Sequence, residues 1–156
     1  MQKAINRDGK VEIVEDKPFC LRQPYQVCNI ADFCNECGNC RTFCPTAGAP
    51  YKDKPRICLT EESFRVEPHG FFIGMENSKR FLKSRTGNGD IETLFLEENQ
   101  YIYETPYISA ILDKNTLRVK HIRFKPSSPL EEVDFKHAAE MSILLTAIGH
   151  LYAKET

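Results

Sequence analysis

From residue 70 onward, short apolar runs separated by turn-forming residues predict a series of β-strands. The runs cover residues 70–74, 79–83, 91–96, 101–104, 107–112 and 116–124. Two of the connections, Gly87-Asn88-Gly89-Asp90 and Asp113-Lys114-Asn115, have compositions typical of tight turns. Because sequential strands with short connections pair as neighbours, we expect a small antiparallel meander sheet.

After these strands, apolar residues recur at helical spacing. They are Phe135, Ala138, Met141, Leu145, Ile148 and Tyr152. We expect Asp134 to be the N-cap of a helix that runs from Phe135 to about Ala153. A meander sheet packed with one C-terminal helix is an α+β core, which we place at residues 59–156.

The first 58 residues have a different pattern. Asp8-Gly9 lies between Ala4-Ile5 and the alternating residues 11–14, which predicts a short hairpin or an extended arm. Proline and glycine then interrupt residues 19–58 repeatedly, so we expect loops there and a single helical turn near residues 41–44. Thr60 is the expected cap of a short helix that follows. The sequence therefore divides into residues 1–58 and residues 59–156.

All seven cysteines lie in the first part, and four of them match the bacterial ferredoxin pattern C-x2-C-x2-C-x3-C-P. These four are Cys34, Cys37, Cys40 and Cys44. Three thiolates spaced by two residues can curl around one 4Fe-4S cluster, and glycine lets the backbone bend closely round it. The sequence thus predicts a loop-rich, ferredoxin-like iron–sulfur segment, with the four cysteines as metal ligands and Gly38 as a cofactor-binding residue.

The ligand set has one open point. In two-cluster ferredoxins the last cysteine of the run binds the other cluster, so Cys44 is either a ligand of a different cluster or free. The first cluster would then take its fourth ligand from Cys20, Cys28 or Cys58, or from cysteines outside this chain. A buried, non-ligating role is the alternative for each of those three. We expect one cluster in this chain, and a second only if missing or partner cysteines complete it.

Zinc is the main chemical alternative to iron. Structural zinc sites take their ligands from two short pairs separated by a dozen or more residues, whereas Cys34 to Cys44 occupy eleven positions. Disulfides are disfavoured by the odd number of cysteines and by the absence of an export signal in residues 1–20. The sequence therefore favours iron–sulfur.

Charge and hydropathy exclude several classes of partner. A net charge of −1 and a pI near 6.4 leave no basic patch for nucleic acid. No apolar run is long enough to cross a bilayer, so we expect a cytoplasmic protein without a membrane partner. The chain has no P-loop and no G-x-G-x-x-G, so we expect no flavin or nicotinamide bound by this chain alone.

Around the cysteines, the sequence resembles a known family. The stretches that carry the resemblance are residues 22–26, Ile30-Ala31-Asp32-Phe33-Cys34-Asn35-Glu36-Cys37-Gly38-Asn39-Cys40, Phe43-Cys44-Pro45 and residues 48–54. They resemble the C-terminal iron–sulfur region of the flavoprotein family named as selenate reductase subunits, which is related to the glutamate synthase small subunit and to dihydropyrimidine dehydrogenase. The resemblance covers about a third of the chain, and it implies electron transfer between a flavin and another redox centre.

These observations predict an electron-transfer module that is part of a larger flavin-dependent oxidoreductase rather than an enzyme by itself. Its expected partner is a flavoprotein or another redox domain or subunit. Two alternatives from other classes stay open: an iron- or redox-sensing regulatory protein, and a zinc-stabilised interaction module.

Overall fold

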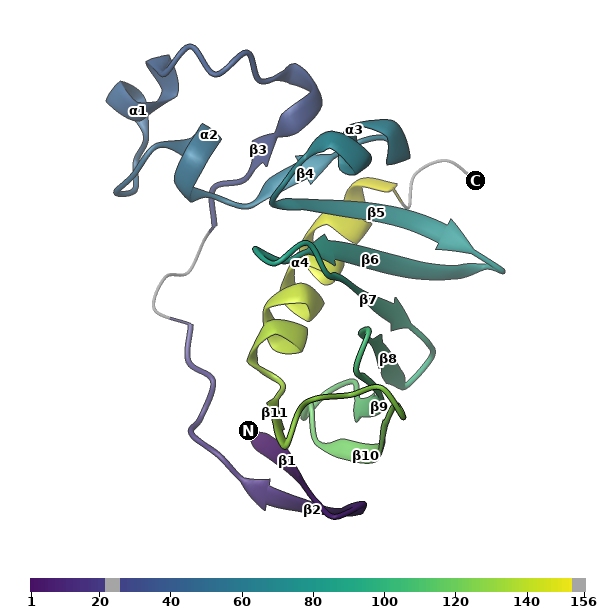
Figure 1. The fold of residues 1–156 in the computed structure, drawn as a ribbon. Coiled ribbons are helices and arrows are strands. Elements are labelled where there is room, and N and C mark those ends of the chain that lie inside the picture. Colours follow the sequence, from purple (N-terminus) through teal and green to yellow (C-terminus); the bar gives the residue numbers. More distant parts are fainter. Residues whose placement is uncertain (22–25, 153–156) are drawn as a thin grey trace.

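Two sheets and one long helix make up the fold (Figure 1). The computed structural model describes residues 1–21 and 26–152, and for residues 149–152 the backbone alone. The large sheet has the strand order β10-β9-β8-β7-β6-β5-β4-β3, and the small sheet has the order β11-β1-β2. The strands are β1 (Gln2–Arg7), β2 (Lys10–Glu15), β3 (Asn29–Ile30), β4 (Arg56–Cys58), β5 (Gly70–Glu76), β6 (Lys79–Arg85), β7 (Ile91–Leu96), β8 (Gln100–Glu104), β9 (Ile108–Asp113), β10 (Val119–Phe124) and β11 (Glu132–Asp134). The helices are the 3-10 helix η1 (Ala31–Phe33) and the α-helices α1 (Asn39–Phe43), α2 (Pro50–Asp53), α3 (Glu61–Val66) and α4 (Lys136–Tyr152).

The strands from β5 to β10 form an antiparallel meander at the positions that the apolar runs indicate. The last strand begins later than expected, at Val119, because the connection before it is longer. The Asp113 carboxylate accepts hydrogen bonds from the Asn115 and Thr116 backbone N–H groups and from the Thr116 hydroxyl. Leu117, with a φ of 55°, then turns the chain back into β10.

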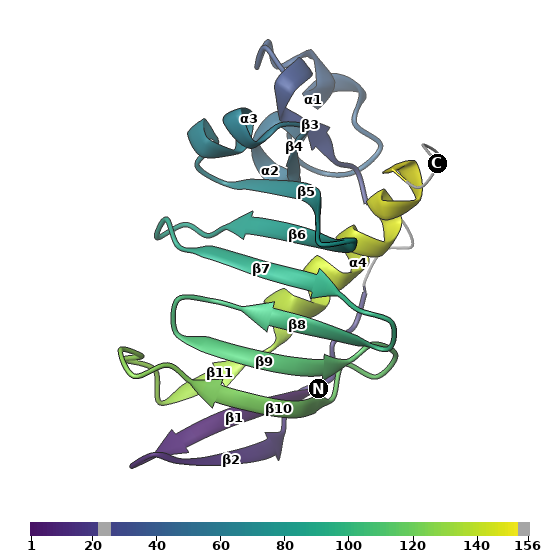
Figure 2. The same cartoon turned by 90° about the vertical axis from the view of Figure 1, so that its right-hand side faces the viewer.

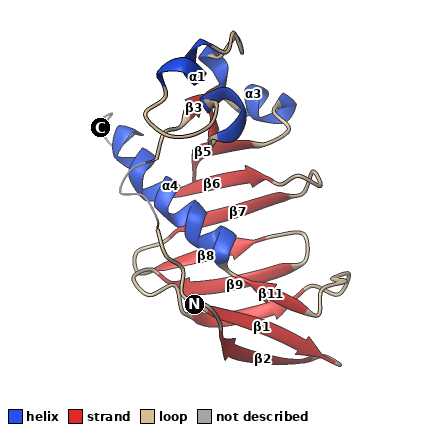
Figure 3. Ribbon diagram, turned by 90° about the vertical axis from the view of Figure 1, so that its left-hand side faces the viewer, coloured by secondary structure: helices blue, strands red, loops and turns tan. Residues whose placement is uncertain are grey.

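Helix α4 lies diagonally across one face of the large sheet (Figures 2 and 3). Its residues Ala138, Met141 and Leu145, and Phe135 just before it, are buried in the core with β-strand side chains, while the side chain of Tyr152 is outside the described part. The helix begins one residue later than predicted. Asp134 ends β11, and its carboxylate accepts the Lys136 N–H, while the Phe135 carbonyl accepts the first N–H bond of the helix, from Ala139.

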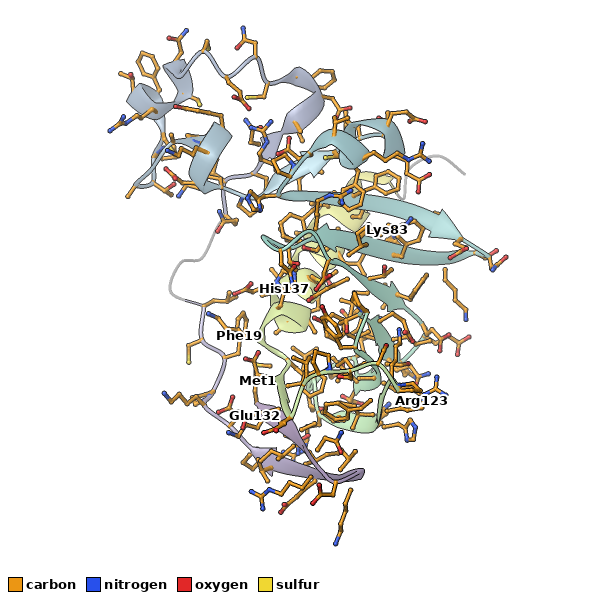
Figure 4. The ribbon with its side chains drawn as sticks, in the orientation of Figure 1. Met1, Phe19, Lys83, Arg123, Glu132 and His137 are labelled. Atoms are coloured by element: carbon orange, nitrogen blue, oxygen red, sulfur yellow. The ribbon has the colours of Figure 1, made fainter. Side chains whose placement is uncertain are left out.

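The opposite face of the sheet carries a row of aromatic rings. Phe72, Phe81 and Phe95 follow one another across β5, β6 and β7 with ring centroids about 6 Å apart, and Phe64 of α3 extends the row. Side chains alternate along a strand, so Phe81 and its neighbour Leu82 point to opposite faces. Lys83, labelled in Figure 4, lies with its ammonium 5.2 Å from the Phe81 ring centroid. The row stabilises the end of the sheet nearest α3.

The predicted N-terminal hairpin is present as β1 and β2, with Asp8 and Gly9 both at positive φ in the turn. It does not stand apart as an arm. Strand β1 pairs antiparallel with β11 near the C-terminal end, and Ala4 is fully buried in the same core as α4. Residues from both sides of the expected boundary at residue 58 therefore share one hydrophobic core.

Two short parallel strands, which the sequence did not indicate, extend the large sheet beyond the meander. β4 pairs with β5 across the connection that contains α3, where Thr60 and Ser63 form the predicted cap in a reciprocal capping box. β3 pairs with β4 on the other side. One continuous sheet therefore contains strands from before and after the expected boundary at residue 58. The fold is thus a sheet-rich α+β arrangement with one long helix; the division into residues 1–58 and 59–156 stays a prediction.

Candidate functional site

The cysteine-rich segment is the crossover between the two parallel strands β3 and β4. Parallel strands cannot be joined by a tight hairpin and need a connection of a dozen or more residues. Here the connection contains η1, α1 and α2, and it projects beyond the edge of the large sheet (Figure 1). The Asn29 N–H donates to the Pro55 carbonyl, which closes the base of the connection.

Within this connection, the cysteine loop (residues 34–40) is shaped by local backbone interactions. The Asn35 side-chain oxygen accepts the Cys37 N–H at 3.2 Å, which forms a turn. Glu36 and Gly38 have positive φ values of 55° and 80°, and Gly38 is the N-cap of α1, whose first turn contains Cys40. A Cβ added at Gly38 would meet no heavy atom within 4 Å, so the glycine is required by its φ rather than by lack of space.

Three cysteines of the run line one hollow of about 320 Å³. They are Cys34, Cys37 and Cys40, and Gly38 lies between them on the same wall. The hollow is also lined by Asn29, Ile30, Phe33, Asn35, Glu36 and Tyr51. Three of the four cysteines that the sequence predicts as ligands therefore line the same hollow.

Cys44 is not among the described residues that line this hollow. It follows α1 in extended conformation, as expected for the residue before Pro45, and its sulfur lies 3.3 Å from the Thr46 hydroxyl oxygen. Hydrogen bonds from the Thr46 side chain and backbone hold the pKa of the Cys44 thiol below its usual range, and Lys54 adds to the effect. Cys44 therefore differs from the other three cysteines of the run in its surroundings, and its role as a ligand stays a prediction.

The remaining cysteines occupy three different environments. Cys58 is fully buried on β4, and burial raises the pKa of its thiol. Cys28 is half-buried against the core, and burial raises its pKa as well. Cys20 is exposed. Cys58 has the environment of a small packed hydrophobe, the alternative considered for each of these three residues.

The donor atoms are not gathered around one point. Among the described residues, no three cysteine, histidine or carboxylate side chains lie close enough together to hold a metal ion as they stand. The chemistry of the donor set nevertheless fits an iron–sulfur cluster, because three cysteines of one loop line the same hollow. Asn29 lines it too, and its buried side-chain oxygen has no hydrogen-bond partner among the described atoms.

Beneath the cysteine loop, Arg56 connects three parts of the chain. Its guanidinium donates to the Glu36 carboxylate at 2.9 Å and to the Tyr51 carbonyl at 2.6 Å, and it pairs with the Glu67 carboxylate at 2.9 Å. The side chains of Arg56 and Glu67 are each only 12% exposed. The loop is therefore tied to β4 through the Arg56–Glu36 ion pair, and the largely buried pair with Glu67 holds Arg56 in place.

A second hollow of about 200 Å³ lies where β11 meets the start of α4, with Glu132 and His137 on its wall (Figure 4). His137 Nε2 lies 3.0 Å from the Ser84 hydroxyl oxygen, and Nδ1 lies 3.5 Å from a Glu140 carboxylate oxygen. Ser84 is only 2% exposed, so its hydroxyl is not accessible as a nucleophile. This hollow has no cysteine among the described residues around it and is not the predicted site.

Three comparisons with known proteins bear on this site. The chain is 45% identical over 40 residues to the protein named "Putative oxidoreductase YgfK" of Escherichia coli strain K12, and equally to the protein of the same name in Escherichia coli O157:H7. The aligned stretch is 26% of this chain and 4% of each relative. No family model and no solved structure matches. A quarter of the chain is therefore similar to part of a much longer protein named as an oxidoreductase.

In the part of the chain that the structure describes, none of the helices has both the length and the apolar character needed to span a bilayer. The longest, α4, uses its apolar side to cover the sheet.

Sequence reasoning missed the residues that hold the cysteine loop in place. Arg56 follows Pro55 and precedes the apolar residues Ile57 and Cys58. These neighbours do not indicate which carboxylates Arg56 pairs with. Glu36 and Glu67 lie 20 residues before it and 11 residues after it, and no helical or strand period connects them. Only the parallel pairing of β4 with β3 and β5 brings these charges together.

Proposed function

We propose that this chain is an electron-transfer module in which Cys34, Cys37 and Cys40 bind a 4Fe-4S cluster. The observation that carries the proposal is that these three cysteines, at ferredoxin spacing, line one hollow on one loop. Such a cluster supplies one-electron transfer when it is bound. The similarity of a quarter of the chain to a protein named as an oxidoreductase supports a redox role.

Each residue of the site has a defined part in this proposal. The three thiols serve as thiolate ligands, and Gly38 allows the backbone turn between Cys37 and Cys40. Cys44, whose sulfur lies against the Thr46 hydroxyl and which does not line the hollow, either binds a different cluster or stays unligated in this chain. The fourth ligand of the first cluster then comes from another cysteine of the chain or from a partner.

The partner that fits this module is a flavoprotein or another redox domain. Phe33 and Phe43, which immediately precede Cys34 and Cys44, are 81% and 84% exposed. Exposed aromatic rings beside a redox centre are suited to a small docking contact, as is usual for electron-transfer partners. The resemblance to the selenate reductase subunit family suggests a flavin as the electron donor or acceptor.

Anaerobic reconstitution of the purified full chain with ferrous iron and sulfide tests the proposal. We expect a brown protein with broad absorbance near 400 nm and about four iron atoms and four sulfides per cluster. Zinc uptake without that absorbance would instead indicate the zinc-stabilised module. A chain that binds neither iron nor sulfide would overturn the proposal.

A further inference from the structure

Arg56 occupies an unusual position for a charged residue. It is the first residue of β4, its side chain is 12% exposed, and its guanidinium reaches groups on three separate segments. Glu36 belongs to the cysteine loop, the Tyr51 carbonyl belongs to α2, and Glu67 follows α3. A planar guanidinium with five donors spread over three nitrogens can hold three such acceptors at once, whereas the three donors of a lysine ammonium all leave one nitrogen.

The loop end of this network has a strained backbone. Glu36 has a φ of 55°, a conformation that side-chain-bearing residues adopt rarely. Its carboxylate is 60% exposed, so the hydrogen bond from Arg56 is what restrains an otherwise open side chain. Because Glu36 lies between Cys34 and Cys37, fixing Glu36 also limits the positions of the two neighbouring thiols.

The buried end of the network is held by packing. Glu67 is 12% exposed, and a Cβ added at Gly70 would lie 2.8 Å from its Cγ. The carboxylate is thus confined between the β5 backbone and Arg56. Removing one partner of such a pair leaves a buried charge without compensation, so the pair keeps Arg56 in place beneath the loop.

Arg56 also lies close to the hollow that the three cysteines line, because its guanidinium is 2.9 Å from the carboxylate of Glu36, which lines that hollow. Burial lowers the pKa of Arg56, but the Glu67 and Glu36 carboxylates outweigh this effect and raise it, so the guanidinium keeps its charge. A fixed positive charge therefore lies beside the place where the cluster of the proposed function would be bound.

We infer that Arg56 is a positioning residue for the cysteine loop, and that its charge raises the reduction potential of a cluster held there. The inference rests on the proposed function. Reduction adds negative charge, and a fixed positive charge in a partly buried position stabilises the reduced state relative to the oxidised state. The carboxylates of Glu36 and Glu67 have the opposite effect, so the network sets the potential through the balance of its three charges.

The test compares four variants of the full chain after anaerobic reconstitution: Arg56→Gln, Arg56→Lys, Glu67→Gln and, as a matched control, Arg65→Gln. Arg65 is also paired with a glutamate, Glu61, but at 3.9 Å on the exposed side of α3. The readouts are iron per chain, the midpoint potential from a redox titration, and amide hydrogen exchange of the chain before reconstitution.

We expect Arg56→Gln to lower both iron content and potential, and Glu67→Gln to raise the potential. Arg56→Lys keeps the charge, so its potential should stay near that of the wild type, although its loop is less restrained. Amide exchange of residues 31–55 in Arg56→Gln should be roughly tenfold faster, as expected for the loss of a hydrogen bond between charged groups. The control should match the wild type in all three readouts.

Several results would overturn the inference. If Arg56→Gln has wild-type iron content, potential and loop protection, Arg56 neither positions the loop nor sets the potential. If Arg56→Lys shifts the potential as far as Arg56→Gln does, charge is not the cause. Should Arg56→Gln take up no iron, faster exchange confined to residues 31–55 supports the inference and faster exchange throughout the chain contradicts it. A wild-type chain that binds no cluster overturns the proposed function itself, a result distinct from all of these.

Discussion

Asn29 and Arg56 lie directly opposite each other in the parallel pair of β3 and β4. One lines the cysteine hollow, and the other holds the loop that carries the thiols. The cysteine segment thus begins and ends at adjacent positions on the edge of the large sheet. The sheet therefore determines where both ends of the irregular cysteine segment lie, and the segment is positioned by a rigid scaffold.

The separation of Cys44 from the hollow leads to a prediction about iron content. Replacing Cys34, Cys37 or Cys40 by serine should remove most of the iron taken up on anaerobic reconstitution, because each change removes a thiolate that lines the hollow. Replacing Cys44 should have a smaller effect. Iron analysis of the four single variants beside the wild-type chain provides the measurement. Equal loss at all four positions would show that one cluster uses the whole run.

The aromatic row predicts a specific intolerance at Gly74. A Cβ at this position would lie 2.4 Å from the Phe81 ring, so Gly74→Ala forces that ring out of its contacts with Phe72 and Phe95. We expect a loss of about 1–3 kcal/mol in the free energy of unfolding, typical of overpacking. Urea denaturation measures it. Gly87→Ala is the control, because its nearest contact would be a His69 carbon at 3.6 Å; similar losses in both variants would contradict the packing argument.

The burial of Ala4 predicts that the N-terminal hairpin is part of the core rather than a separate arm. Ala4→Asp would place a carboxylate at a fully buried position between β2 and β11, and we expect a loss of several kcal/mol in stability. Arg7→Asp introduces the same side chain at an exposed position of the same strand and should change stability little. Thermal denaturation compares the two, and a chain that tolerates Ala4→Asp as well as Arg7→Asp would show that β1 is dispensable.

The turn before β10 predicts a dependence of stability on acid pH. Hydrogen bonds from the Thr116 backbone and hydroxyl lower the pKa of Asp113 to about 2. A carboxyl whose pKa is lower in the folded state contributes stability above its unfolded pKa of about 4, and this contribution disappears as the pH falls through the folded value. Between about pH 4 and pH 2, Asp113→Asn should therefore lose less stability than the wild type does.

Urea midpoints recorded across this pH range test the Asp113 prediction. Glu76→Gln, which neutralises an exposed carboxylate on β5, controls for the loss of one negative charge. If the urea midpoints of Asp113→Asn and the wild type fall in parallel as the pH is lowered, the Asp113 carboxylate does not contribute to acid sensitivity.

The sequence by itself determined the local elements of this protein. Turn residues and apolar runs located the six strands of the meander, and the 3.6-residue period located α4, because each depends on short-range backbone preferences and on a single buried face. The ferredoxin spacing identified the three cysteines that come to line one hollow, since residues three apart on a short loop cannot separate far. These strands, this helix and this cysteine spacing depend on local sequence and not on how the elements pack together.

Only the tertiary structure decided how the site is supported. Strands β3 and β4 contain two and three residues, too few to show a period, and they exist because they add to the edge that β5 presents. Their parallel pairing brings Arg56 to Glu36 and Glu67, and the pairing of β1 with β11 brings Ala4 into a core made mostly by residues 73–148. Such contacts join distant segments through hydrogen bonds between backbones, which carry no side-chain pattern for the sequence to reveal.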